Sequence, residues 1–343
     1  MLARLLCAWL LALPGTAGAA ENYAARLEVR EFIGDMVRRH GFDARELHTV
    51  FSKARRLPQI IRAMTPQPGA PQRSWQAYRS MFVNESRVEA GVAFRLANAT
   101  ALERASQLYG VPEEIIVSVI GVETVYGRNM GAYRVIDALS TLAFDYPPRA
   151  DFFRGELEQF LLHARETGID VFGTRGSYAG AIGIPQFMPG SYRRYAVDFD
   201  GDGRPDLTAS PADAVASVAN FLKEHGWQRD QPIAAPAQVT GEAHRELLSA
   251  GIKPAHRVSD LAAFGVLPQE ALPGELPCAL VELETPGQRP EYWVGLDNFY
   301  AITRYNRSSF YAITVIELAR AIAQASEERA AGRASTATIS APE

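Results

Sequence analysis

The feature that most constrains the fold is a long, nearly continuous apolar stretch over residues 112–124. It begins with Pro112 and two glutamates, a composition typical of the first turn of a helix. One face of that helix is formed by residues at i, i+3, i+4 and i+7, namely Ile116, Val119, Ile120 and Glu123. The pattern predicts a helix packed into an α-helical core, with the carboxylate of Glu123 at the end of its buried face.

A carboxylate in that position indicates acid chemistry. Burying an ionised carboxylate without a partner is costly, and desolvation favours the protonated form. A glutamic acid that stays protonated near neutral pH can act as a general acid on an ether-like oxygen. The alternative is that Glu123 merely emerges at the helix end, where water or a nearby arginine stabilises its charge.

Composition excludes several functional classes. The chain has 343 residues, enough for two or three domains, and its 35 basic and 39 acidic residues are scattered, so no nucleic acid partner is expected. Neither a Gly-rich phosphate loop nor a Gly-x-Ser-x-Gly motif occurs, and the six histidines lack metal-ligand spacing. No organic cofactor is expected.

The N-terminus is typical of a cleavable export signal. Arg4 precedes an apolar run at 5–13, and residues 17–19 form an Ala-Gly-Ala cleavage site. The run is too short to span a membrane. Cys7 lies inside the run, so we do not expect a lipoprotein. We expect a periplasmic protein that keeps only Cys278 after cleavage and therefore has no intrachain disulfide.

Helical patterns dominate, so the expected fold class is mainly α, of the α+β type. Residues 84–109 predict one long amphipathic helix, whereas 276–283 and 292–294 predict short strands. The expected organisation is a signal peptide at 1–19, an N-terminal α domain at 20–100, a helical core at 101–231 resumed at 293–325, a small inserted β domain at 232–292 and a disordered tail at 326–343.

The segment 176–189 is a candidate binding loop. Its glycines and prolines allow backbone and short polar groups to approach a ligand closely. Ser177 and Gln186 can hydrogen-bond sugar hydroxyls or an acetamido group, and Tyr178 and Phe187 can stack on apolar sugar faces. The alternative is a purely structural loop whose polar groups are satisfied internally.

The segment 198–203 reads Asp-Phe-Asp-Gly-Asp-Gly, which matches the first half of an EF-hand calcium loop. The expected Glu at position 12 is replaced by Ala209. The alternative is a solvated acidic turn, but three close carboxylates would repel one another without a cation. The candidate ligands of a structural calcium ion are Asp198, Asp200, Asp202, the backbone carbonyl of Arg204, and either Asp206 or Asp213.

A third candidate segment, residues 299–311, interleaves aromatic side chains with Arg and Asn, which suits a carbohydrate groove. Phe299 and Phe310 are expected in the core. Tyr305, Asn306 and Tyr311 are the better candidates for a cleft.

Together these motifs resemble the lytic murein transglycosylase B family, of the soluble lytic transglycosylase 35 type in the lysozyme-like superfamily. The matching stretches occur in family order and are residues 121–129, 138–153, 176–195, 198–203 and 293–311. The resemblance implies a lysozyme-like helical core, an N-terminal helical domain and a small β domain around one cleft.

The resemblance also implies roles for individual residues. Glu123 would be the sole catalytic acid/base, and Arg149 would lie near the peptide-stem site, where Pro148 replaces a second arginine. Phe221 stands where relatives can carry a cleft tyrosine. The implied saccharide contacts are Ser177, Gln186, Tyr305, Asn306 and Tyr311, and the implied calcium ligands are Asp198, Asp200, Asp202, Arg204 and Asp213.

The predicted activity is cleavage of the β-1,4 bond between N-acetylmuramic acid and N-acetylglucosamine in peptidoglycan, leaving 1,6-anhydromuramic acid ends. Hydrolysis normally needs a second carboxylate, and nothing in the sequence places Asp137 or Asp145 in the cleft. A hydrolytic muramidase and a non-catalytic peptidoglycan-binding protein remain the alternatives. The expected partners are glycan strands, with cell-wall synthases as candidates, and the expected state is a monomer.

Overall fold

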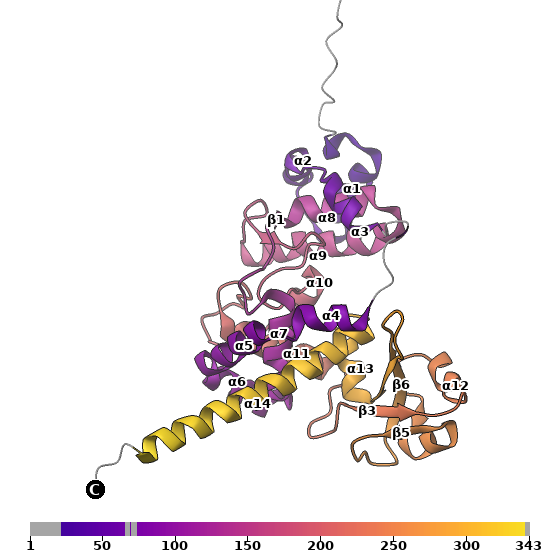
Figure 1. Cartoon of the computed structure of the whole chain (residues 1–343). Coiled ribbons are helices and arrows are strands. Elements are labelled where there is room, and N and C mark those ends of the chain that lie inside the picture. The colour runs from indigo at the N-terminus through magenta and orange to yellow at the C-terminus, as the bar shows by residue number, and fades with distance from the viewer. Residues whose placement is uncertain (1–21, 66–68, 70–73, 340–343) are drawn as a thin grey trace, which may run out of the picture.

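Figure 1 shows the computed structural model of the chain, which describes residues 22–65, 69 and 74–339. The predicted signal peptide at 1–19 lies outside the described residues. The mainly α fold with a small sheet confirms the expected fold class.

The first body, at the top of Figure 1, packs N-terminal helices on two later ones. The side chain of Asp43 accepts hydrogen bonds from the amides of Arg45 and Glu46 and so caps the start of α2 (Ala44–Lys53). Gly41, with φ of 66°, ends α1 (Leu27–His40). Phe32, Phe51 and Phe144 meet edge to face in its core. Its elements are η1 (Tyr23–Ala25), α1 (Leu27–His40), α2 (Ala44–Lys53), α3 (Pro58–Met64), α8 (Val135–Asp145), η2 (Pro147–Arg149) and α9 (Ala150–Thr167).

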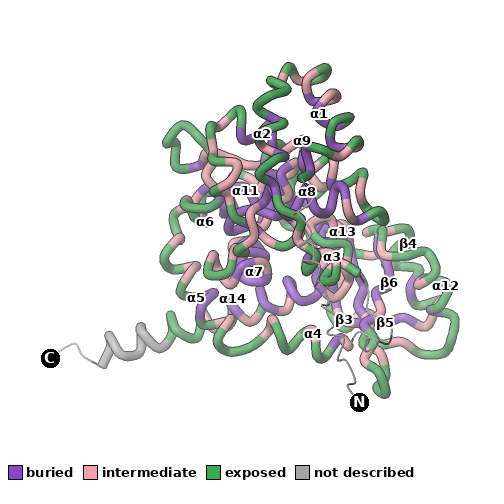
Figure 2. Tube along the Cα trace, turned by 90° about the horizontal axis from the view of Figure 1, so that it is seen from above, coloured by how far each residue is buried: buried purple, intermediate pink, exposed green. Residues whose placement is uncertain are grey.

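The second body surrounds α7 (Glu113–Thr124). Residues 115–122 of α7 are all buried, and α5, α6, α11 and α14 pack against it, as the purple segments of Figure 2 indicate. The hydroxyl of Ser118 donates to the carbonyl of Val315 at 2.7 Å, which joins α7 to α14. The other helices of this body are α4 (Trp75–Phe82), α5 (Glu85–Ala97), α6 (Ala99–Tyr109), α11 (Pro211–Glu224), α13 (Asp297–Thr303) and α14 (Ser309–Ile339), and α10 (Pro189–Tyr195) packs mainly on α9 of the first body.

The third body is a five-stranded antiparallel sheet in the order β4-β6-β7-β3-β5, with its own small apolar core. The amide of Trp75 donates to the carbonyl of Glu284 at 2.8 Å and ties this body to α4. The elements are β3 (Ala234–Val239), α12 (His244–Ser249), β4 (His256–Arg257), η3 (Val258–Phe264), β5 (Val266–Pro268), β6 (Pro277–Leu283) and β7 (Glu291–Gly295). The short strands β1 (Tyr133–Arg134) and β2 (Arg175–Gly176) pair separately.

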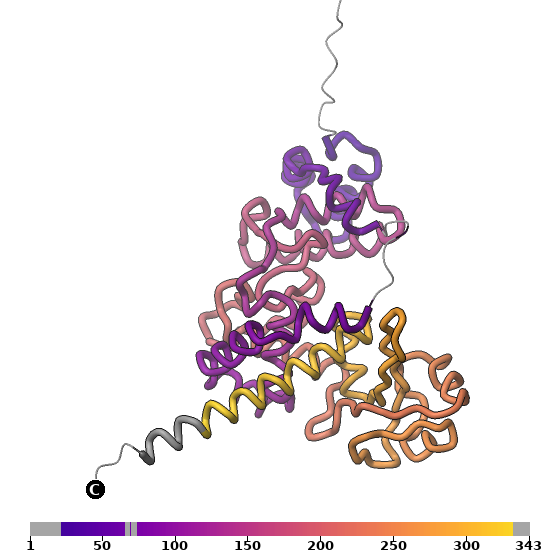
Figure 3. The backbone as a smooth tube through the Cα atoms, in the orientation of Figure 1, coloured from indigo at the N-terminus to yellow at the C-terminus, as the bar shows by residue number. Residues whose placement is uncertain are grey.

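Three expectations differ from the structure. The single helix predicted at 84–109 is two helices, α5 and α6, because Asn98 leaves the helical conformation and its side chain donates to the carbonyl of Phe94. Within the segment 20–100, α1 to α3 pack in the first body, whereas α4 and α5 lie along α14, as Figure 3 shows. The tail predicted from residue 326 instead continues α14 to Ile339, since its Ala and Glu residues favour helix.

Candidate active site

Glu123 lies in the last turn of α7, half-buried, with one carboxylate oxygen accepting a hydrogen bond from the Tyr311 hydroxyl at 2.7 Å. Burial raises the pKa of Glu123 to about 7, and the hydrogen bond from Tyr311 opposes that rise. Among the described residues, no arginine or lysine forms an ion pair with it. The contacts therefore favour a protonated acid over an arginine-paired helix end.

The backbone turns sharply after Glu123. Val125 and Tyr126 have φ of 53° and 61°, a left-handed conformation that is costly for residues other than glycine. The buried hydroxyl of Thr124 donates to the carbonyl of Ile184 at 2.8 Å and accepts from the amide of Gly127 at 2.9 Å. These bonds fasten the end of α7 to the loop at 176–189, so the two candidate segments meet.

The loop at 176–189 is held mainly by its own hydrogen bonds. The Ser177 hydroxyl oxygen accepts from the amides of Ala179 and Ala181 at 3.3 and 3.1 Å. Gln186 has φ of 52°, and its side-chain nitrogen donates to the carbonyls of Met130 and Gly183 at 3.1 and 2.9 Å. These bonds use the side-chain nitrogen and leave the amide oxygen of Gln186 as the group that can receive a sugar donor.

Aromatic side chains pack together between the loop at 176–189, α11 and the segment 299–311. The ring of Tyr305 lies nearly parallel to that of Tyr311, with centroids 6.3 Å apart, and its hydroxyl donates to the carbonyl of Pro185. Phe187 and Phe221 are only 2% and 5% exposed and pack against Tyr305. These two rings support the cleft and offer little surface for the expected sugar stacking. Tyr178, at 45% exposure, remains available.

Tyr311 is likewise only 2% exposed, so its observed contact is with Glu123. Phe299 is fully buried, as expected for the core. Phe310 is half-buried and packs on Trp75, with ring centroids 5.5 Å apart.

A pocket of about 700 Å³, called here the cleft pocket, brings six of the predicted residues together. Glu156, Phe152, Arg304 and Arg307 also line it. The two arginines belong to the candidate segment at 299–311, whereas Glu156 and Phe152 were not among the predicted residues. Nothing in α9 marks Glu156 or Phe152, because its pattern is that of an ordinary amphipathic helix. Ser177, Tyr178, Tyr311 and Glu123 are not among its lining residues. The predicted residues in its wall are Arg149, Gln186, Phe187, Phe221, Tyr305 and Asn306.

Asp137 and Asp145, the carboxylates considered as second catalytic groups, belong to ion pairs in the first body. Asp137 is 4% exposed and pairs with Arg134 at 2.8 Å. Asp145 pairs with Arg26 at 2.9 Å and Arg56 at 3.1 Å. Neither lines the cleft pocket.

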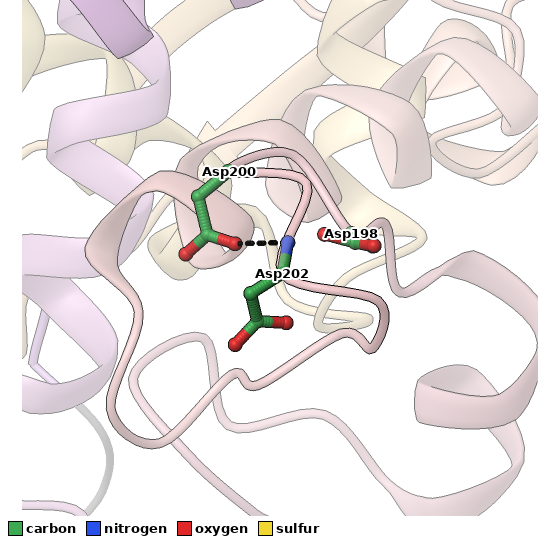
Figure 4. Close-up of side chains that lie close together, drawn as sticks. All are labelled: Asp198, Asp200 and Asp202. Atoms are coloured by element: carbon green, nitrogen blue, oxygen red, sulfur yellow. Dashed lines mark hydrogen bonds between the residues drawn. The ribbon is translucent and has the colours of Figure 1, made fainter.

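The acidic loop gathers Asp198, Asp200 and Asp202, with one oxygen of each within 4.8 Å of the others (Figure 4). Oxygen-only ligands at this spacing suit a hard cation such as calcium. The hydroxyl of Ser210 donates to Asp200 at 2.7 Å. The donor chemistry of the three aspartates therefore fits the predicted ion.

The two candidate closing ligands, Asp206 and Asp213, do not belong to the group of three aspartates. Asp213 is fully buried and accepts from the amides of Phe199, Asp200 and Asp206 at 2.8, 3.2 and 2.7 Å. One oxygen of Asp206 accepts from the amides of Thr208 and Ala209. Asp213 is therefore an internal brace of the loop, because the amides of three loop residues donate to its two oxygens.

Comparisons with known proteins agree with this geometry. The family described as "Transglycosylase SLT domain" matches residues 24–320. Membrane-bound lytic murein transglycosylase B of Escherichia coli (strain K12) is 45% identical over 312 residues, covering 89% of this chain and 85% of that protein.

Solved structures show the same fold. The Escherichia coli lytic transglycosylase SLT35 in complex with bulgecin A has a TM-score of 0.81 and 46% sequence identity to this chain. The same enzyme in complex with calcium has a TM-score of 0.79 and 45% identity. Each of these comparisons covers 89% of this chain and 95% of the SLT35 chain. SltB3 from Pseudomonas aeruginosa in complex with NAG-anhNAM-pentapeptide has a TM-score of 0.74 and 32% identity, covering 85% and 78%.

No helix in the described part of the chain has both the length and the apolarity that crossing a membrane requires. The matched family spans all three bodies and includes Glu123, the loop it contacts and the acidic loop. The resemblance expected from the motifs is confirmed, and the chain belongs to the transglycosylase SLT domain family, with lytic murein transglycosylase B among its relatives.

Proposed function

We propose that this chain is a peptidoglycan lytic transglycosylase that cleaves the β-1,4 bond between N-acetylmuramic acid and N-acetylglucosamine and leaves 1,6-anhydromuramic acid ends. The observation that carries the proposal is Glu123, half-buried and accepting a hydrogen bond from Tyr311, with a pKa near 7. A carboxyl group with that pKa can give and take a proton at physiological pH.

In the proposed mechanism, Glu123 donates its proton to the leaving glycosidic oxygen while positive charge develops on the muramic sugar. The ionised Glu123 keeps the hydrogen bond from Tyr311, which stabilises the carboxylate. Glu123 then takes the proton of the C6 hydroxyl, whose oxygen attacks C1 and closes the anhydro ring. Gln186, Asn306 and Tyr178 are proposed to position the sugars.

Among the described residues that line the cleft pocket there is no second carboxylate besides Glu156, which favours intramolecular closure over hydrolysis. One of the oxygens of Glu156 accepts a hydrogen bond from the amide of Gly190 at 2.8 Å. Inverting and retaining hydrolases need a second carboxylate as base or nucleophile. The 2-acetamido group of the substrate is therefore proposed to stabilise the developing cation.

We also propose that Asp198, Asp200, Asp202 and the carbonyl of Arg204 hold a structural calcium ion. The spacing of the three carboxylates supports this, as does the calcium complex of the relative SLT35. A bound cation would cancel the mutual repulsion of the aspartates and stiffen the loop that precedes α11.

Export by a cleavable signal at 1–19, a periplasmic location without a lipid anchor, a monomeric state and candidate synthase partners are proposals from the sequence. The relative from Escherichia coli is named membrane-bound, so the lipid question needs a direct test. Mass spectrometry of the mature N-terminus answers it: cleavage near residue 19 supports the proposal, and a lipidated cysteine contradicts it.

To test the function, purified peptidoglycan sacculi are digested with wild type, Glu123→Gln and the control Glu156→Gln, and the masses of the products are measured by mass spectrometry. Wild type and Glu156→Gln are expected to release muropeptides one water lighter than hydrolytic products, and Glu123→Gln none. Reducing ends, lost in Glu156→Gln, would establish a hydrolytic muramidase. No products from any variant would indicate a binding protein.

A further inference from the structure

The strained turn that follows Glu123 contains a tyrosine that does not line the cleft pocket. Tyr126, with φ of 61°, directs its ring between α5 and α7. A strained backbone persists at a functional site only where the surrounding contacts over-determine it. The contacts of Tyr126 therefore identify what holds the end of α7 in place.

Two glycines make room for the ring of Tyr126. A Cβ atom at Gly121 in α7 would lie 2.6 Å from the Tyr126 hydroxyl oxygen and 2.7 Å from Cζ of its ring. A Cβ atom at Gly91 in α5 would lie 2.5 Å from the same hydroxyl oxygen. Phe94 of α5 also packs on the ring, with centroids 5.6 Å apart. The ring thus fills a slot between Gly91 and Gly121, called here the tyrosine slot, which a larger side chain at either glycine would narrow.

The polar end of Tyr126 is fixed by α5. Its hydroxyl donates to the carbonyl of Arg87 at 2.9 Å, and burial raises the pKa of Tyr126, so the hydroxyl stays protonated and remains a donor. The guanidinium group of Arg87 in turn donates to the carbonyl of Gly121 in the last turn of α7. One residue of α5 therefore binds both the turn and the end of the helix that carries Glu123.

The titratable groups that face Glu123 come from elements other than α5. Tyr311 of α14 donates to the carboxylate, and burial and the charge of Glu123 raise the pKa of Tyr305. The charges that act on Tyr126 are those of Arg87 and Arg128. Burial and the bond from Tyr311 set the pKa of Glu123, so α5 acts on Glu123 through the backbone and not through charge.

We propose that Tyr126 is a positioning residue for Glu123: by filling the tyrosine slot it keeps the strained turn closed and the carboxyl group directed at the scissile bond. This rests on the proposed function, in which Glu123 is the acid. A displacement of a reacting group by about 1 Å costs about 100-fold in rate. Since Tyr126 does not line the cleft pocket, its loss should slow the chemistry without weakening glycan binding.

The first test measures kcat and KM on soluble peptidoglycan strands, counted as new anhydro ends. Tyr126→Leu removes the ring and the hydroxyl and should lower kcat about tenfold to a hundredfold, with KM changed by less than about twofold. Tyr126→Phe keeps the ring and should recover most of that loss. The matched control is Tyr146→Phe, which removes a comparable bond from a buried tyrosine to the carbonyl of Met64 at 3.0 Å and should change neither constant.

A second test asks whether the ring acts through the tyrosine slot. Gly121→Ala places a methyl group against the ring of Tyr126 and should lower kcat about tenfold. The control Gly155→Ala, at an exposed position of α9 with open space around it, should not. In the double variant Gly121→Ala/Tyr126→Leu the methyl group no longer meets the ring, so kcat should be no lower than in Tyr126→Leu alone. Additive losses would refute the slot.

A titration separates positioning from a general loss of stability. If the turn opens in Tyr126→Leu, water reaches Glu123 and weakens the desolvation that raises its pKa. The NMR titration of the Glu123 carboxyl group and the alkaline limb of kcat/KM should then both move to lower pH. An unchanged titration, an unchanged kcat or a rise in KM alone would overturn the inference.

Circular dichroism establishes that each variant is folded, and if Tyr126→Leu does not fold, the same readouts on Tyr126→Phe decide the question. The NMR titration needs no turnover. A wild type that leaves no anhydro ends would therefore overturn the proposed function, while the titration would still decide whether Tyr126 positions Glu123.

Discussion

Replacing Glu123 with glutamine should stabilise the protein, and more so as pH rises. Burial raises the pKa of Glu123 from 4.5 to about 7 in the folded state. The folded state thus keeps a proton that the unfolded chain releases between these values, so the free energy of unfolding falls as pH rises through that window. Glutamine is neutral throughout and can still accept the hydrogen bond from Tyr311.

The size of the effect follows from the two pKa values. Compared with a glutamate whose pKa stays at 4.5, the raised pKa of Glu123 should lower the free energy of unfolding by about 3 kcal/mol at pH 8 and about 1 kcal/mol at pH 5. The stability gain of Glu123→Gln over wild type should therefore be about 2 kcal/mol larger at pH 8 than at pH 5. All other titrating groups cancel in this difference.

The assay is urea unfolding of wild type and Glu123→Gln, followed by tryptophan fluorescence at both pH values. The control is Glu89→Gln, which makes the same substitution at an exposed glutamate on α5 and is measured at the same two pH values. An equal gain for Glu123→Gln at the two pH values would refute the reasoning, because the folded and unfolded states would then release the Glu123 proton over the same pH range.

Three further outcomes are expected. Tyr311→Phe removes a hydrogen bond that lowers the pKa of Glu123, so the loss of kcat/KM at alkaline pH should move to higher pH; a shift to lower pH contradicts the assignment. Calcium should raise the melting temperature of wild type and not that of Asp200→Ala; no shift in wild type would favour a solvated acidic turn. Asp213→Ala leaves three amides without their acceptor and should cost about 3 kcal/mol in urea unfolding even without calcium; a cost near zero would refute its role as a brace.

Local patterns were enough to predict much of the fold. The apolar helix that ends in Glu123, the strands at 276–283 and 292–294 and the acidic loop all carry their signal in a few neighbouring residues. The break at Asn98 was missed, because a polar residue between two amphipathic helices of similar composition resembles the exposed face of one helix.

The candidate site was only partly predictable. The glycine-rich loop and the Tyr305 segment are recognisable by composition, and Gln186, Tyr305 and Asn306 do line one pocket. Whether an aromatic ring faces a ligand or the core depends on what covers it. The rings of Phe187 and Phe221, predicted at the cleft, are covered by each other and by Tyr305.

By itself the sequence determined the apolar helix at 112–124, the strands at 276–283 and 292–294, and that one buried helix face ends in a carboxylate. Only the tertiary structure decided that Tyr311, 188 positions away, donates to Glu123, and that Gly91 and Gly121 make room for the ring of Tyr126. The physical reason is that periodicity reports the environment of neighbours along the chain. Burial, pKa and hydrogen-bond partners depend on which distant segments pack together.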